Sequence, residues 1–153
     1  METPSTFTPQ ERWQSIKAAL LCGIAAGTVA ALLTGLHRWQ SLGIPEVWMS
    51  LRGGLSGWSF WIGAVIAGIS GGVFGLTYRY AVRCDQNPQL KSGVVLAFGL
   101  VRGLALVDVA SALSQGWPWL VGVAESLLLF AIAGRSLDWA MERHWIQPFG
   151  KDR

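Results

Sequence analysis

Charged residues are scarce in this sequence of 153 residues. Asp, Glu, Lys and Arg together make up 14% of it, whereas a soluble domain usually contains about 25%. Hydrophobic residues make up 52%, and the mean hydropathy is +0.40. This shortage of charge excludes a disordered chain, a coiled coil and most soluble enzymes. The composition instead indicates a membrane protein.

Cysteine and histidine are equally rare, with two of each. Cys22 lies in an apolar run and Cys84 in a charged loop, so we expect two reduced thiols rather than a disulfide framework. The sequence has no Ser/His/Asp set, no metal-ligand spacing and no Gly-rich phosphate loop, so we predict no catalytic site, no metal site and no enzymatic activity. A net charge of +3 without a basic helix of interleaved aromatics argues against nucleic-acid binding.

Long apolar runs are the main positive feature. A helix crosses the bilayer core with roughly 20 mostly apolar residues. Four runs meet this requirement: Ala18–Leu36, Leu55–Leu76, Gly93–Leu113 and Trp119–Gly134. We therefore predict an all-α, four-helix transmembrane bundle formed by residues 18–134, with an N-terminal segment at 1–17 and an amphipathic tail at 135–153. A short interfacial helix is expected near Pro45 to Leu51.

Lys and Arg are distributed unevenly between the two sides of the predicted bundle. With four spans, both termini and the loop from Thr77 to Ser92 share one side. That side has nine Lys or Arg residues, and the other side has two, Arg38 and Arg52. Because basic residues are held back on the cytoplasmic side, we predict an integral membrane protein with both termini facing the cytoplasm, or the stroma in a plastid-type membrane.

Small residues recur every four positions in the first three runs, which places them on one face of each helix. Such faces let helices approach closely in lipid. We therefore predict glycine-rich helix–helix interfaces and a glycine-lined core between the first three spans. The predicted packing residues are Gly23, Gly27, Ala31, Gly35, Gly63, Ala67, Gly71, Gly75, Gly99 and Gly103.

Three ionisable residues interrupt the third and fourth runs: Arg102, Asp108 and Glu125. A charged side chain at the centre of a bilayer costs at least about 2.5–3.5 kcal/mol, so Arg102 should face the bundle and have a partner. Glu125 on the neighbouring helix is the expected partner, because the arginine side chain can reach along the helix axis. This intramembrane polar site is either an ion pair that fixes helix register or part of a proton or ion path.

Two functions fit these features. The first is a non-enzymatic accessory, assembly or scaffold subunit of a larger membrane complex, with membrane lipid and another membrane protein as its partners. It would dock through a small-residue face and a basic loop. That loop consists of Tyr78, Arg79, Tyr80, Arg83 and Lys91. The second function is a small transporter or proton-conducting protein that uses the polar site. We expect no cofactor, and a pigment bound through His37 is a more remote alternative.

Part of the chain resembles a known family. The relevant segments are Gly71–Arg83 (GGVFGLTYRYAVR), Asn87–Gly93 (NPQLKSG) and Phe98–Gly103 (FGLVRG). They resemble a family of small multi-span proteins of cyanobacterial and plant plastid membranes, over the second and third runs. The resemblance implies a thylakoid location and an accessory or assembly role near photosynthetic complexes, and it implies no catalytic residues.

The architecture is also similar to that of the Tim17/Tim22 preprotein-translocase superfamily. Those proteins have four spans with glycine faces and a Gly-x-x-Phe segment before a basic loop, as Gly71 to Phe74 precedes Arg83 here. The Arg-x-x-x-Asp spacing expected in that loop is missing, because Arg83 and Asp85 are only two residues apart. The similarity therefore concerns architecture and not protein import.

Overall fold

The computed structural model describes residues 8–42, 55–83, 85, 87–112 and 118–150. These residues form four helices: α1 (Pro9–Leu42), α3 (Leu55–Val82), α4 (Pro88–Ala112) and α5 (Pro118–Glu142). The described residues contain no strand, so the prediction of an all-α fold is confirmed. The interfacial helix expected near Pro45 to Leu51 and the thiol of Cys84 lie outside these ranges.

The helices begin at local sequence signals. α1 starts with a capping box, in which the Thr8 hydroxyl accepts a hydrogen bond from the Glu11 N–H at 3.2 Å. The Glu11 carboxylate accepts a hydrogen bond from the Thr8 N–H at 3.1 Å in return. α4 starts at Pro88 after Asn87, whose side-chain oxygen accepts a hydrogen bond from the Gln89 N–H at 2.9 Å. Proline fits the first position of a helix because its missing N–H would have no partner there.

The helices extend beyond the apolar runs that predicted them. α1 continues to Leu42, past the expected end at Leu36, and α5 continues to Glu142, past Gly134. The backbone hydrogen bonds of a helix do not depend on apolar side chains, so the polar flanks continue the same helices. Residues 135–142 of the predicted tail thus belong to α5.

After α5 the chain reverses sharply. His144 has a φ of 59°, in the left-handed region typical of a helix end. The N–H of Trp145 donates to the Ala140 carbonyl at 3.0 Å, which satisfies one of the last carbonyls of the helix. Ile146 and Phe149 are then buried against the bundle. Residues 143–150, called the C-terminal segment below, are therefore packed against the helices.

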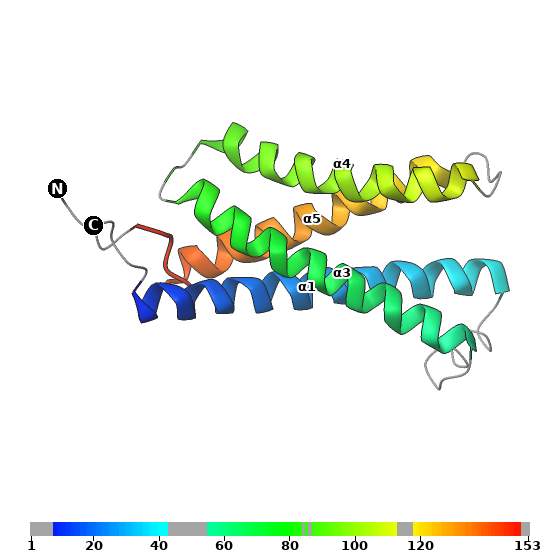
Figure 1. The fold of residues 1–153 in the computed structure, drawn as a ribbon, viewed down its shortest axis with the longest axis horizontal. Helices are drawn as coiled ribbons and strands as arrows, with labels where there is room; N and C mark the ends of the chain where they lie inside the picture. Colours follow the sequence, from blue (N-terminus) through cyan, green and yellow to red (C-terminus); the bar gives the residue numbers. More distant parts are fainter. Residues whose placement is uncertain (1–7, 43–54, 84, 86, 113–117, 151–153) are drawn as a thin grey trace.

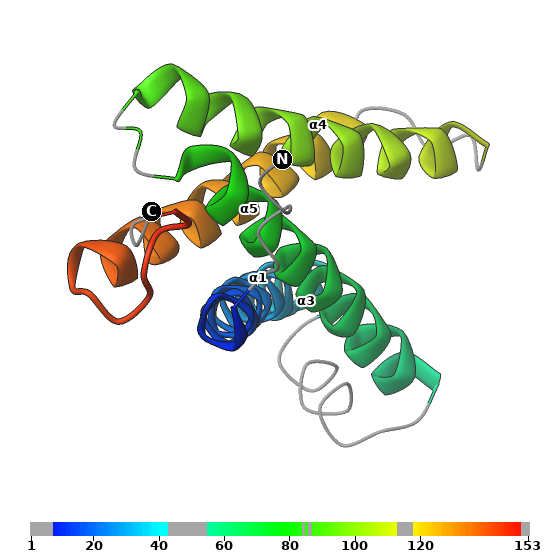
Figure 2. The same ribbon diagram turned by 60° about the vertical axis from the view of Figure 1, so that its left-hand side comes forward.

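The helices form two main pairs, α1 with α3 and α4 with α5 (Figure 1). α5 also packs against α1, whereas α4 contacts α3 only slightly and lies on the outside of the bundle (Figure 2). The start of α1, the end of α3, the start of α4 and the C-terminal segment share one end of the bundle, called the terminal end here. The opposite end is called the far end.

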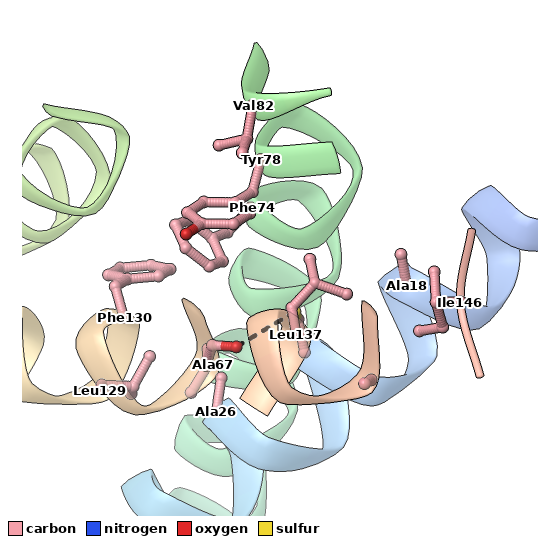
Figure 3. Close-up of a cluster of buried hydrophobic side chains, with 13 residues drawn as sticks. Ala18, Ala26, Ala67, Phe74, Tyr78, Val82, Leu129, Phe130, Leu137 and Ile146 are labelled. Atoms are coloured by element: carbon pink, nitrogen blue, oxygen red, sulfur yellow. Dashed lines mark hydrogen bonds between the residues drawn. The ribbon is translucent and has the colours of Figure 1, made fainter. Parts of the chain in front are cut away.

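The buried core lies in the half of the bundle nearest the terminal end. On α1 it consists of the small residues Ala18, Cys22 and Ala26. Phe74 of α3 and Phe130 of α5 point toward each other (Figure 3), with ring centroids 5.2 Å apart. Small residues on α1 allow α3 and α5 to approach it closely, and the aromatic rings fill the space that remains.

All four helices are long and apolar enough to cross a membrane. Their outer surfaces expose large apolar side chains along the whole bundle, including Ile24, Leu32, Trp58 and Val101. A soluble monomer rarely exposes so extensive an apolar surface to water.

Candidate functional site

Several predicted packing residues lie where α1 and α3 are closest. A Cβ atom added at Gly23 would be 2.9 Å from the Gly68 carbonyl oxygen, and one at Gly27 would be 3.3 Å from a carbonyl oxygen of α3. A Cβ atom at Gly71 or Gly75 would be 2.6 Å from a carbonyl oxygen of α1. These four positions admit no larger residue without movement of the facing backbone. Ala67, four positions before Gly71 on α3, is fully buried.

The other predicted packing glycines are placed differently. An added Cβ at Gly35 or Gly63 would have nothing within 4 Å, because α1 and α3 diverge toward the far end (Figure 1). Gly99 and Gly103 of α4 lie against α5. α4 therefore does not complete the glycine-lined core that we expected between the first three spans, since its packing partner is α5.

An apolar groove, called the α1–α3 groove below, runs along the outer side of the contact between these helices. Its volume is about 780 Å³. Exposed side chains of Leu20, Ile24, Val65 and Ile69 line it, together with a series of small residues. Those small residues are Ala19, Gly23, Gly27, Ala31, Ala64, Gly68 and Gly72. The groove is thus a long apolar surface with helix backbone close beneath it.

Two of the three predicted intramembrane charges line a common polar cavity. Arg102 of α4 and Glu125 of α5 both border a space of about 190 Å³ that also includes Thr34 of α1 and Ser126 of α5. A polar cavity of this size holds several water molecules. The structure therefore brings Arg102 and Glu125 to one site, which is called the polar cavity below.

The closest basic group to Glu125 is not the predicted Arg102. Its Oε1 atom lies 3.5 Å from Nδ1 of His37 on α1. Within the described ranges Arg102 makes no ion pair with Glu125, although both border the cavity. α1 continues as a helix beyond Leu36, which brings His37 to the depth of Glu125. His37, expected only as a remote candidate for pigment binding, is therefore part of the polar site.

Asp108 is placed differently from Arg102 and Glu125. Its side chain is exposed on α4 and does not line the polar cavity. Arg102 and Asp108 are six positions apart, which is about 9 Å along the axis and on different faces of the helix. The structure therefore brings Arg102 and Glu125 to one cavity, with His37 beside Glu125, and it places Asp108 outside the lining of that cavity.

Arg79 is predicted to be part of a basic docking loop. In the structure its side chain instead forms hydrogen bonds within the protein. Its side chain is buried at 1% exposure. Its Nε donates to the Gln147 carbonyl at 2.8 Å, and its Nη1 donates to Ser15 Oγ at 2.6 Å and to the Glu11 carbonyl at 3.3 Å. The Phe149 ring centroid lies 5.7 Å from the guanidinium. Arg79 therefore joins α3 to α1 and to the C-terminal segment.

The rest of the predicted docking loop is also largely engaged within the protein. Tyr78 is buried, and its hydroxyl donates to Asp138 Oδ2 at 3.0 Å. Lys91 and Tyr80 are half-buried, and Lys91 Nζ lies 3.0 Å from Asp138 Oδ1. Only Arg83 of the five is exposed. The basic loop is thus not an open docking surface, because Asp138 and backbone carbonyls distant in sequence bind its polar groups.

Comparisons with models of protein families, with curated proteins and with solved structures found no match. The class of protein is therefore inferred from the four helices alone. Four helices of this length and hydropathy fit a multi-pass integral membrane protein.

Proposed function

We propose that this protein is a non-enzymatic accessory, assembly or scaffold subunit of a larger membrane complex, and that the α1–α3 groove receives a transmembrane helix of its partner. The supporting observation is the groove itself, which is apolar and has small residues along its length. Small residues let helix backbones approach closely where lipid removes the usual hydrophobic driving force. On α1 the groove extends from Ile16 to Ala31, about 22 Å of helix, which is a length suited to a second helix.

This docking surface differs from the one expected from the sequence. Gly71 and Gly75 pack against α1, and Tyr78 and Arg79 are buried. These residues hold the bundle together and are not accessible to a partner. The exposed residues of the groove, such as Ile24 and Val65, form the surface that remains for one.

The proposed location is a thylakoid membrane, with both termini on the cytoplasmic or stromal side. The resemblance of the second and third runs to a family of plastid-type membranes supports the proposed thylakoid location. The excess of Lys and Arg at the terminal end supports the orientation. On this proposal the partner is a component of a photosynthetic complex.

Val65→Trp should displace the partner. Val65 is exposed and lines the groove, so an indole there would fill space that the partner helix needs. We expect the fraction of protein that co-migrates with a large complex after mild-detergent extraction to fall about tenfold, which corresponds to about 1.4 kcal/mol of binding. Native gel electrophoresis of extracted membranes measures this fraction.

The matched control is Ile66→Trp. Ile66 is adjacent on α3, is similarly exposed and does not line the groove. This variant should co-migrate with the complex as the unaltered protein does. The proposal fails if the unaltered protein migrates alone, or if both tryptophan variants remain in the complex.

A second candidate function, a small proton- or ion-conducting protein, is supported by the polar cavity. Arg102 and Glu125 border the same polar space, and the Glu125–His37 pair lies beside it. Ionisable groups at membrane depth are typical of proton and ion pathways.

On this alternative, Glu125→Gln should reduce proton flux into liposomes to the level of protein-free vesicles, because an amide cannot bind and release a proton. A fluorescent pH indicator inside the liposomes measures the flux. The control is Glu142→Gln, an exposed position at the end of the same helix, which should leave the flux unchanged. Absence of flux with the unaltered protein would eliminate this alternative.

A further inference from the structure

A second groove, called the α4–α5 groove, lies between these helices toward the terminal end. Its volume is about 670 Å³. Gly99 of α4 lies against Leu127 of α5, with an added Cβ only 3.0 Å from the Leu127 Cα atom, so the helices are close together there. Toward the terminal end the groove is lined by apolar side chains, including Val95, Leu96 and Leu128. Leu96 and Leu128 are exposed to the surrounding lipid.

The end of this groove is cationic. Lys91 of α4 and Arg135 of α5 line it, together with Asp138. Both carboxylate oxygens of Asp138 have partners, Tyr78 at 3.0 Å and Lys91 at 3.0 Å. Arg135 is exposed and forms no ion pair with any residue that the structure describes. Two cations therefore face one carboxylate, which leaves a net charge of +1.

The first turn of α4 adds to this positive charge. Pro88 begins the helix and also lines the groove. Asn87 Oδ1 accepts a hydrogen bond from the Gln89 N–H, and the helix dipole places a partial positive charge at this end of α4, which favours anions. The cationic end thus combines two basic side chains with one helix terminus, and it adjoins an apolar channel that is open to lipid.

We infer that the α4–α5 groove binds an anionic phospholipid, with its phosphate between Lys91 and Arg135 and an acyl chain along Val95, Leu96 and Leu128. A phosphate oxygen accepts charge-assisted hydrogen bonds from both basic groups, and basic pockets between membrane helices bind anionic headgroups. A soluble anion would leave the apolar channel unoccupied. An apolar helix bound in the groove would bury Arg135 without a counter-charge. An amphiphile with one negative headgroup matches both parts of the groove. This site is separate from the α1–α3 groove and does not depend on the proposed function.

Native mass spectrometry of the detergent-solubilised protein tests this inference. Dioleoyl phosphatidylglycerol and dioleoyl phosphatidylcholine are added in equal amounts, so that the two probes share their acyl chains and differ in net charge. The unaltered protein should retain phosphatidylglycerol preferentially. Arg135→Gln should reduce this preference about fivefold, the factor expected for one basic residue near a headgroup.

Arg12→Gln is the matched control, because Arg12 is an exposed arginine at the terminal end of α1 and does not line the groove. This variant should keep the preference. Equal losses in the two variants, or no preference in the unaltered protein, would overturn the inference. Free glycerol 3-phosphate should not compete with the lipid. Competition by that anion would mean a soluble-anion site and would overturn the assignment to lipid.

Discussion

Gly75→Ala should destabilise the protein by about 2 kcal/mol, although alanine is the better helix former by about 1 kcal/mol. The added Cβ would lie 2.6 Å from the Ala18 carbonyl oxygen and 2.8 Å from the Cys22 Cβ. Neither neighbour can move without the backbone of α1, so α1 and α3 must separate. Unfolding in mixed micelles with increasing sodium dodecyl sulfate, followed by circular dichroism, measures the loss.

Gly63→Ala on the same helix is the control. An added Cβ there meets nothing within 4 Å, so only the gain in helix propensity remains. The variant should be as stable as the unaltered protein, or more stable by up to about 1 kcal/mol. If the two alanine variants unfolded together, the close approach of α1 and α3 at Gly75 would be refuted.

Arg79→Met should lower stability by about 3 kcal/mol and release the C-terminal segment. The methionine keeps an apolar stem but loses the hydrogen bonds to Gln147, Ser15 and Glu11. Hydrogen bonds to charged groups contribute about 1.5–3 kcal/mol each, and relief of the desolvation of the buried guanidinium offsets part of their sum. Arg79→Lys should restore only part of the loss, because an ammonium is a compact donor that lacks the spread of the guanidinium.

Hydrogen exchange of residues 143–150 gives the local measure of this effect. Their protection should fall strongly in Arg79→Met, and it should change little in Arg83→Met, because Arg83 is exposed. The guanidinium of Arg83 nevertheless lies over the Phe149 ring, 5.6 Å from its centroid. The Arg83→Met control therefore removes a ring contact to the C-terminal segment without removing the hydrogen bonds of Arg79. Equal loss of protection in both variants would show that stacking, and not hydrogen bonding, holds the segment.

The course of the four helices could be predicted because it depends on local properties of the sequence. An uncharged run such as Leu55–Leu76 predicts a span from its own composition, and α3 begins at Leu55 as expected. The ends of the helices are harder to predict from the sequence. The end of α3 at Val82, beyond Leu76, depends on a polar flank in which Arg79 finds its partners on α1 and in the C-terminal segment.

The polar sites could not be predicted in the same way, because they are formed by contacts between helices. The sequence of one apolar run does not show such contacts. The pairing of Glu125 with His37 joins α5 to α1, and it requires the extension of α1 past Leu36. The sequence places Asp138 in the predicted tail, whereas in the structure it belongs to α5 and binds Tyr78 and Lys91 on two other helices. The sequence signal that would have indicated it is its spacing of four from Gly134 and eight from Phe130, which places the three residues on one side of α5, where a buried carboxylate requires partners.

The contact between the first turns of α1 and the C-terminal segment joins residues that are synthesised far apart in time. The Gln147 N–H donates to the Gln14 side chain at 3.3 Å, across 133 positions of sequence. α1 is synthesised first, yet this contact forms only after residue 147 has left the ribosome. Until then the Arg79 guanidinium lacks the Gln147 carbonyl, although its partners Ser15 and Glu11 on α1 are already present. Because residue 147 follows the last residue of α5, all four helices are synthesised before this contact can form.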